Sequence, residues 1–153
     1  MDKINPKYIG YCGLYCGNCA FKVKITPGAI TLHKEIKKAG FGDIIQLIPG
    51  GEAFWSFLKG MVNPGICSSC KDGGGNPGCA VRICAKEKHV QLCALCELYP
   101  CEKFIPFFEN YSVLKQDNEL LKEKGMEVWT ELQDTRRKTG FCYGDCDKSN
   151  GGG

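Results

Sequence analysis

The amino-acid sequence predicts a small, mainly α-helical domain in which short helices alternate with irregular, cysteine-rich loops. Apolar residues recur at three- and four-residue spacing in several segments, as in amphipathic helices. No run of alternating apolar and polar residues indicates a β-strand beyond short ribbons beside the cysteine pairs. Twelve cysteines accompany only two histidines in 153 residues, so the loops between the helices carry an unusual density of thiols.

These cysteines are grouped along the chain. The groups are Cys12, Cys16 and Cys19; Cys67 and Cys70; Cys79 and Cys84; Cys93, Cys96 and Cys101; and Cys142 and Cys146. Thiolate is the soft ligand that zinc and iron–sulfur clusters prefer, and a C-x-x-C spacing lets two sulfurs converge on one ion. The predicted fold class is therefore a mainly α, irregular, metal-stabilised domain with zinc-ribbon-like knuckles joined by short helices.

Length and charge restrict the organisation and the partners. We expect one domain over residues 1–147, because 153 residues suit a single core, and a disordered tail over residues 148–153. The net charge of +3 with 24% charged residues gives no support for nucleic acid or a membrane surface as a partner. A partner, if there is one, is expected to be another protein, and the sequence leaves the oligomeric state open.

The cellular compartment decides how the thiols are used. The first seven residues have no apolar core of a signal peptide, and no segment has the length of a membrane span. We therefore expect a cytoplasmic protein, in which thiols stay reduced and bind metal instead of forming six disulfides.

A helical insert is predicted over residues 26–62. In its first helix Thr26 is the expected N-cap, Pro27 opens the first turn and Gly40 lies just past the end. The apolar face of this helix is expected to be Ala29, Leu32, Ile36 and Ala39, with His33 solvated beside it. A second helix is expected over residues 52–61, with Phe54, Trp55, Leu58 and Met61 turned inward.

The remaining segments follow from their turn residues. The glycine-rich stretch 71–78 lacks the Gly-Lys-Ser/Thr of a phosphate-binding loop and is expected to be a connector. A short helix is expected from Cys79 to about Lys88. A C-terminal helical pair is expected over residues 112–139, as Ser112 to Lys124 and Met126 to Lys138, with Gly125 ending the first helix.

The most compact set of ligands is Cys84, Cys93, Cys96 and Cys101, which lie within eighteen residues. A C-x-x-C knuckle supplies two sulfurs, the preceding helix one and the following turn one, which is typical of a closed tetrahedral zinc site. Cys79 is not expected to join it, because five residues along a helix rotate a side chain by about 140° relative to Cys84.

The second set is predicted to be Cys16, Cys19, Cys67 and Cys70, two knuckles in a zinc-ribbon-like arrangement. Cys12, Cys79, Cys142 and Cys146 remain. They form a third metal site, serve as spare ligands, or are buried thiols, because free cysteine is among the most buried residue types. His89 between Cys84 and Cys93 is a weaker candidate, since thiolates already suffice nearby.

Several of these motifs together resemble a prokaryotic cysteine-rich family catalogued as domain of unknown function 3795. They are YCGLYCGNC over residues 11–19, CSSC over 67–70, CAVRICAKEK over 79–88, CALC over 93–96, YPCE over 99–102 and LKEKGMEVW over 121–129. The resemblance implies a metal binder, with zinc the expected ion, and no established reaction. A glycine often follows the 79–88 motif in that family, where this chain has His89, which weakens His89 further as a ligand.

Three functional classes compete. Four-thiolate zinc sites have no open coordination position, which favours a non-enzymatic, macromolecule-binding module. An iron–sulfur protein in electron transfer or redox sensing is the alternative, although the cysteine run of a standard ferredoxin is missing. Cys12-x₃-Cys16-x₂-Cys19 also matches the cluster spacing of S-adenosylmethionine radical enzymes. The chain, however, is too short for their barrel and has no βαβ alternation, so no catalytic residue is assigned.

Overall fold

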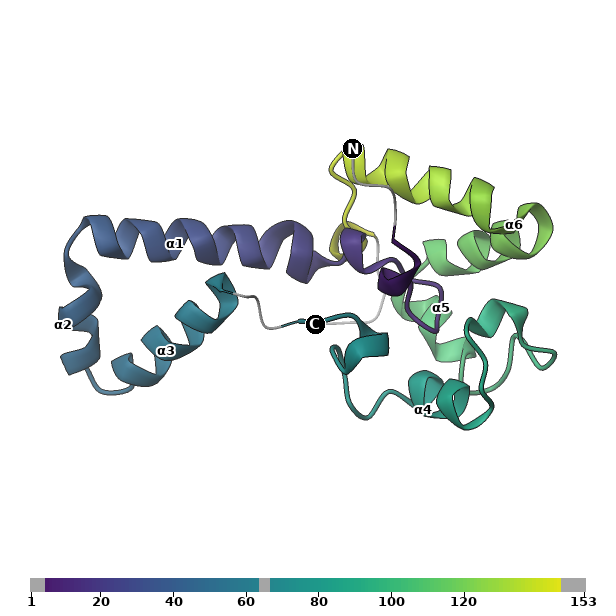
Figure 1. Ribbon diagram of the computed structural model, residues 1–153, viewed down its shortest axis with the longest axis horizontal. Coiled ribbons are helices and arrows are strands. Elements are labelled where there is room, and N and C mark those ends of the chain that lie inside the picture. The colour runs from purple at the N-terminus through teal and green to yellow at the C-terminus, as the bar shows by residue number, and fades with distance from the viewer. Residues whose placement is uncertain (1–4, 64–66, 147–153) are drawn as a thin grey trace.

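The computed structural model describes residues 5–63 and 67–146, and this part of the chain is mainly helical, as predicted. Within these ranges no β-strand forms, and an isolated antiparallel bridge joins Ile9 and Tyr15. Figure 1 shows two parts: helices α1 to α3 project to one side, and α4 to α6 surround the N-terminal cysteine turns on the other. The helical insert therefore stands apart from the cysteine-rich part of the molecule.

Helix α1 spans Thr26–Lys38 and continues a π-helical segment, Phe21–Ile25, without interruption. Ile25 and Thr26 both have right-handed helical dihedrals, whereas an N-cap residue ordinarily does not. The prediction of Thr26 as an N-cap was therefore wrong, because the helix starts one turn earlier. Its end was predicted correctly: Gly40 takes the left-handed conformation, with φ 72°, that stops a helix.

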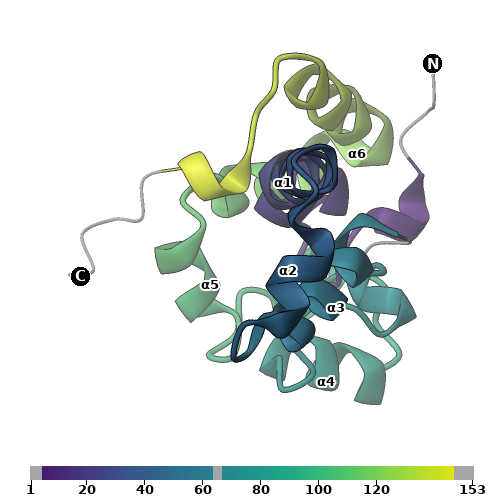
Figure 2. The ribbon, with the colours of Figure 1, turned by 90° about the vertical axis from the view of Figure 1, so that its left-hand side faces the viewer.

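Helices α2, Phe41–Leu47, and α3, Gly51–Val62, complete the insert. The expected helix over residues 52–61 corresponds to α3. Figure 1 shows α3 running back alongside α1, with α2 at the far end of the insert. Seen along the insert in Figure 2, α2 and α3 lie to the same side of α1. Helix α2 was not predicted, because seven residues between two glycine-containing turns are too few to show a clear helical period.

The insert has its own small core of Ala29, Trp55 and Leu58, against which Ile36 and Met61 pack. Three residues that were expected in this core are exposed instead: Leu32 at 47%, Phe54 at 43%, and Ala39 just past the end of α1. His33 is not simply solvated, since its ring stacks on that of Trp55 at 5.0 Å. Helices α1 and α3 therefore bury only some of the apolar side chains that their sequences provide.

The other part of the fold begins with α4, Ala80–Glu87, and continues through α5, Ile105–Asn110, which was not predicted. Val81 and Phe104 form a core with Leu114, surrounded by half-buried aromatic residues. Helix α4 ends at Glu87. His89, two residues later, has a left-handed φ of 54°, and the Val90 amide donates to the Ala85 carbonyl at 2.8 Å. His89 thus occupies a position that favours glycine.

Helix α6, Val113–Lys138, is two helices joined at Gly125, where φ is 81° and ψ 178°. The predicted C-terminal pair with its break at Gly125 is therefore confirmed. The chain folds back at this point (Figure 1), and Leu121 and Trp129 from the two halves meet in one core with Ile9 and Tyr15. The C-terminal hairpin thereby packs on the N-terminal cysteine turn.

The predicted tail, residues 148–153, lies outside the described residues. Among the helices of the described part, none is long and apolar enough to cross a membrane.

Candidate metal centre

The cysteine pairs lie in tight turns whose geometry follows from their spacing. Cys16–Asn18 and Cys93–Leu95 are 3₁₀ turns, closed by hydrogen bonds from the Cys19 amide to the Cys16 carbonyl at 3.2 Å and from the Cys96 amide to the Cys93 carbonyl at 2.9 Å. Side chains three residues apart eclipse in such a turn, so each pair directs both thiols to the same side. Cys70 differs, because it begins its own 3₁₀ turn, Cys70–Asp72, instead of ending one.

The four cysteines of the first predicted set line one cavity of about 200 Å³: Cys84, Cys93, Cys96 and Cys101. Helix α4 contributes the first, the 3₁₀ turn the next two, and the segment before α5 the last. Burial, together with smaller contributions from the neighbouring thiols of Cys101, Cys96 and Cys84, raises the pKa of Cys93 to about 12. The surroundings of Cys93 therefore disfavour a bare thiolate and suit a thiol or a metal-bound sulfur.

A second, larger cavity of about 620 Å³ is also rich in cysteine. Its lining includes Cys12, Cys16, Cys19, Cys70 and Cys79. Three of the four cysteines of the second predicted set, Cys16, Cys19 and Cys70, therefore line this cavity. Cys67, the fourth, is close enough to Cys16 to influence its titration. Cys12 and Cys79, which sequence reasoning left unassigned, share this cavity with the second set. Cys79 and Cys84 line different cavities, as expected, but the helix rotation is not the reason, because Cys79 is the extended N-cap residue and α4 begins at Ala80.

Burial dominates the titration of this second group as well. It raises the pKa of Cys12 to about 12, with additional contributions from the thiols of Cys70, Cys79 and Cys93. It raises the pKa of Cys16 to about 11, although a backbone hydrogen bond from Cys70 acts in the opposite direction. Cys12 and Cys16 in this cavity, like Cys93 in the first, therefore hold their protons until a cation replaces them.

Cys142 and Cys146 behave differently from the other cysteines. Cys142 is 1% exposed, and the Cys146 thiol lies 3.9 Å from the Cys142 carbonyl oxygen. Neither residue lines either cavity, although Tyr143 and Gly144 between them line the second. The C-terminal turn thus reaches the wall of the second cavity while its own thiols lie outside it.

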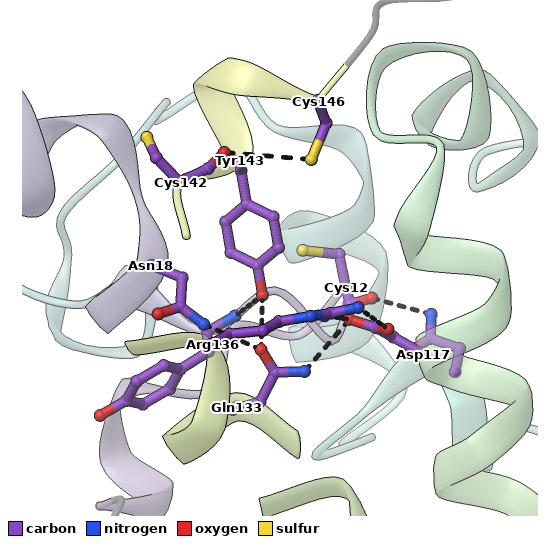
Figure 3. Close-up of polar contacts among 10 residues, drawn as sticks. Cys12, Asn18, Asp117, Gln133, Arg136, Cys142, Tyr143 and Cys146 are labelled. Carbon is purple, nitrogen blue, oxygen red and sulfur yellow. Dashed lines mark hydrogen bonds and ion pairs between the residues drawn. The ribbon is translucent and has the colours of Figure 1, made fainter. Parts of the chain in front are cut away.

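A buried polar network holds this C-terminal turn against the N-terminal cysteines (Figure 3). The Tyr143 hydroxyl donates to Gln133 Oε1 at 3.1 Å and accepts from the Tyr15 amide at 3.1 Å. Asn18, between Cys16 and Cys19, donates to the same Gln133 oxygen at 3.0 Å. Asn118 donates to the Cys12 carbonyl at 3.0 Å. The α6 hairpin thereby fixes the backbone at both ends of the Cys12 to Cys19 segment.

Sequence reasoning did not find this network. Gln133 and Asn118 are fully buried, yet a polar residue on a helix is ordinarily assigned to the solvent side. Gln133 and Arg136 are three residues apart and therefore lie on one face of the helix. This shared face was the signal in the sequence that polar side chains gather there.

The sulfur atoms line common cavities without meeting. Within residues 5–63 and 67–146, no three Cys, His, Asp or Glu side chains are placed closely enough to hold one metal ion. No disulfide joins the cysteines either, and all twelve thiols are free. Neither histidine is part of the lining of the two cavities: His89 is exposed just after α4, and His33 is stacked on Trp55 in the insert.

A family model described as "Protein of unknown function (DUF3795)" matches residues 8–106, about two thirds of the chain. The chain belongs to this DUF3795 family. The matched region contains ten of the twelve cysteines, from Cys12 to Cys101, together with the helical insert. It ends before the α6 hairpin and before Cys142 and Cys146. No curated protein and no solved structure matches the chain significantly.

Proposed function

We propose that this chain is a zinc-binding, cysteine-rich protein with structural four-thiolate sites. The main support is that Cys84, Cys93, Cys96 and Cys101, contributed by three successive segments, line one small cavity. Four cysteine thiolates satisfy the tetrahedral preference of zinc and leave no open position. Zinc at this site would supply a cross-link between α4 and the segment before α5, and no reaction.

The second proposed site takes Cys16, Cys19, Cys67 and Cys70, which bring a zinc-ribbon-like pair of knuckles together across the helical insert. The influence of Cys70 and Cys67 on the pKa of Cys16 supports this pairing, because it requires the two knuckles to lie near each other. Cys12 and Cys79, in the same cavity, and Cys142 and Cys146, beside it, are the candidate ligands of a third ion.

Loading these sites requires the thiols to move inward and lose their protons. Zinc–sulfur bonds are about 2.3 Å long, so four ligands of one ion must converge more closely than they do here. Structural zinc binding contributes on the order of 10 kcal/mol, which exceeds the cost of moving a short turn of a few residues. We therefore propose that metal binding draws together cysteines that the polypeptide has already gathered around one cavity.

A partner protein is proposed because apolar side chains surround the first cysteine set. Leu95, inside the Cys93 knuckle, is 62% exposed, and Leu98 just after it is 61% exposed. Ile83 on α4 and Ile105 at the start of α5 add further exposed apolar surface. A filled zinc site would hold these residues rigidly, and a rigid apolar patch suits binding to another protein. A cytoplasmic location, where thiols stay reduced, belongs to the same proposal.

An iron–sulfur cluster is the alternative, and the second cavity favours it. At about 620 Å³ with five cysteines in its lining, it is larger than one zinc ion requires. A four-iron cluster takes four thiolates and would serve electron transfer or redox sensing.

Protein purified and analysed without oxygen separates these possibilities. The proposal expects colourless protein with about two or three zinc ions per chain and no sulfide. A brown sample with stoichiometric iron and sulfide would instead establish the iron–sulfur alternative. Protein that folds to a stable, cooperative structure with no bound metal would overturn both.

A further inference from the structure

The second cavity has a positively charged wall. Of the described residues that line it, Arg82 is the one with a charged side chain at neutral pH, and it lies among five cysteines. The first cavity differs, because Lys88, Glu102 and Lys103 bring both signs of charge to its lining. A single, uncompensated positive charge therefore distinguishes the larger cysteine-rich cavity from the smaller one.

Arg82 is also unusually buried for an arginine. Its exposed fraction is 8%, and a guanidinium keeps its proton at any pH that a folded protein tolerates. Arginine is almost never buried to this extent unless it is paired, because an isolated charge loses the solvation of water without any compensation. The burial of Arg82 therefore requires a negative partner.

The described part of the chain offers Arg82 carbonyl oxygens but no carboxylate. Its Nη1 atom donates to the Gly74 carbonyl at 2.6 Å and to the Cys70 carbonyl at 3.4 Å. Within residues 5–63 and 67–146, no Asp or Glu forms an ion pair with it, and its Nε and Nη2 atoms have no hydrogen-bond partner. Two of its three nitrogen atoms thus remain available to an acceptor in the cavity.

The backbone on both sides of Arg82 holds its charge at this cavity. Arg82 and Cys84 are two residues apart on α4, which rotates their side chains by about 200° relative to each other. Cys84 accordingly lines the first cavity and Arg82 the second. On the other side, the turn that begins at Cys70 continues to Gly74, whose amide donates to the Ser69 carbonyl at 2.9 Å. The guanidinium is thereby held between α4 and the second cysteine knuckle.

A filled metal site in this cavity would supply the missing negative charge. A cysteine thiol is neutral, whereas a cysteine sulfur that binds zinc is a thiolate. Four thiolates exceed the charge of one Zn²⁺ by two units, so the complete centre is an anion. The same burial that makes Arg82 unfavourable alone would make its attraction to such a centre strong.

We propose that Arg82 is the counter-charge of the metal–thiolate centre in the second cavity, where it strengthens metal binding without being a ligand. This inference rests on the proposed zinc function of Cys16, Cys19, Cys67 and Cys70. Residues that act on the ligands of a metal from outside the ligand set typically change its affinity by about 10- to 100-fold.

Chelator competition on the full-length, zinc-loaded protein tests the role of Arg82. Arg82→Gln removes the charge and keeps an amide donor, and it should lower the affinity for one zinc equivalent by about 10- to 100-fold. The zinc held by Cys84, Cys93, Cys96 and Cys101 should titrate as in the wild type. Arg82→Lys should restore most of the lost affinity, because it returns the charge without the planar, forked set of donors.

Lys86→Gln is the matched control for the charge. Lys86 is exposed and lies one turn later on α4, so this variant has the same net charge as Arg82→Gln. All of its zinc affinities should equal those of the wild type, because solvent screens an exposed charge.

Asn76→Asp approaches the same charge from the cavity side. Asn76 lines the second cavity, and its Oδ1 atom accepts a hydrogen bond from the Gly78 amide at 2.9 Å, which an aspartate oxygen can also accept. The added carboxylate competes with the thiolates for Arg82, so the affinity for the same zinc equivalent should fall.

The outcomes separate the role of Arg82 from the metal site itself. Wild-type protein that binds no metal refutes the proposed function, and the inference with it. Zinc-loaded protein in which Arg82→Gln leaves every affinity unchanged overturns the role of Arg82 alone. Equal weakening by Arg82→Gln and Arg82→Lys also overturns it, because the hydrogen bonds to Gly74 and Cys70 would then be the cause. If Arg82→Gln does not fold, unchanged zinc affinity in Asn76→Asp overturns the inference.

Discussion

Arg136 forms a two-pronged ion pair with Asp117, nineteen residues earlier in α6, with Arg136 Nη2 at 2.9 Å from Asp117 Oδ1. In a straight helix these residues would stand about 28 Å apart. The reversal at Gly125 brings them together, and Gln133 adds a hydrogen bond to the same carboxylate at 3.1 Å. Asp117 is 2% exposed, so its charge depends on these partners. The pair therefore couples the two halves of the hairpin.

Removing the Asp117 carboxylate should be strongly destabilising. Asp117→Ala leaves the 17% exposed Arg136 guanidinium without its partner, and breaking a largely buried pair in this way costs about 3–5 kcal/mol. The measurement is the free energy of unfolding from urea titration of the metal-loaded protein.

Asp134→Ala is the matched control for this experiment. Asp134 pairs with Arg137 and Lys138 on the outer side of the same helix, where solvent screens the charges. This change should have little effect on the unfolding midpoint. Equal losses of unfolding free energy in the two variants would show that the buried Asp117–Arg136 pair stabilises the fold no more than the exposed pairs of Asp134 do.

Tyr143 should make stability depend on alkaline pH. Burial is the main cause that raises the pKa of its phenol above the ordinary value. The folded state therefore holds this proton at pH values where the unfolded chain, with a tyrosine pKa near 10, releases it. Since the folded state then binds more protons, its stability is complete below about pH 10 and declines as the pH rises further.

Tyr143→Phe tests this dependence. The variant loses the hydrogen bonds to Gln133 and Tyr15, which should cost about 1 kcal/mol at neutral pH. Above pH 10 it should lose stability less steeply than the wild type, because the titrating group is gone. Tyr8→Phe, which removes a phenol that packs against the core of Ile9, Leu121 and Trp129, is the comparison variant. If the stability of the wild type and of Tyr143→Phe fell equally steeply above pH 10, Tyr143 would not be the group responsible for the pH dependence.

The helices that were predicted correctly have strong local signals. Gly40 and Gly125 both adopt left-handed backbone conformations, which glycine accepts without strain, and each ends a helix where the sequence indicated. Helices α2 and α5 were missed because they have seven and six residues, too few for periodicity to separate them from turns. A glycine in the sequence therefore predicts where a helix ends more reliably than periodicity predicts whether a helix of six or seven residues forms.

The candidate site was predictable only at the level of residue type. The grouping of Cys84 with Cys93, Cys96 and Cys101 follows from short sequence separations, and these four do share a cavity. Tertiary contacts decide the rest. The exposure of Leu32, and the burial of Gln133 against the Cys16 to Cys19 turn, depend on how distant segments meet. Apolar residues at helical spacing show that a helix has an apolar face, but not which other segment covers that face.

His89→Gly should stabilise the protein. His89 has a φ of 54°, which costs a side chain with a Cβ atom about 1 kcal/mol relative to glycine. The variant should raise the unfolding midpoint and leave the bound metal unchanged. A loss of one metal equivalent would instead identify His89 as a ligand. Lys88→Gly, one residue earlier at φ −90°, should be neutral or destabilising and serves as the control.

Cys96→Ser tests the first proposed zinc site. Loss of one thiolate leaves an incomplete ligand set, and the binding energy lost is on the order of 10 kcal/mol of folding stability. The variant should lose about one zinc equivalent and be molten or insoluble. Leu95→Ser, in the same turn and 62% exposed, is the control and should keep its metal. A Cys96→Ser protein with full metal content and an unchanged melting temperature would refute this ligand set.

Cys142 and Cys146 remain the test of a third ion. Truncation after Gly140 would be a poor experiment, because it also removes Tyr143 and its buried hydrogen bonds. The double variant Cys142→Ala, Cys146→Ala keeps Tyr143 and removes only the thiols. If the pair shares an ion with Cys12 or Cys79, metal analysis should show a loss of about one equivalent, because an incomplete ligand set binds far more weakly.

The variant Lys24→Ala is the control for this change. Lys24 pairs with Asp145 and holds the same turn from the surface, so its loss perturbs the turn without removing a thiol. If the double variant keeps all its metal, the two cysteines are not ligands. Reaction with a thiol reagent should then divide them by burial, with the 1% exposed Cys142 protected until the protein unfolds and Cys146 modified in the folded state. Protection of both thiols that depends on bound metal would instead support the third site.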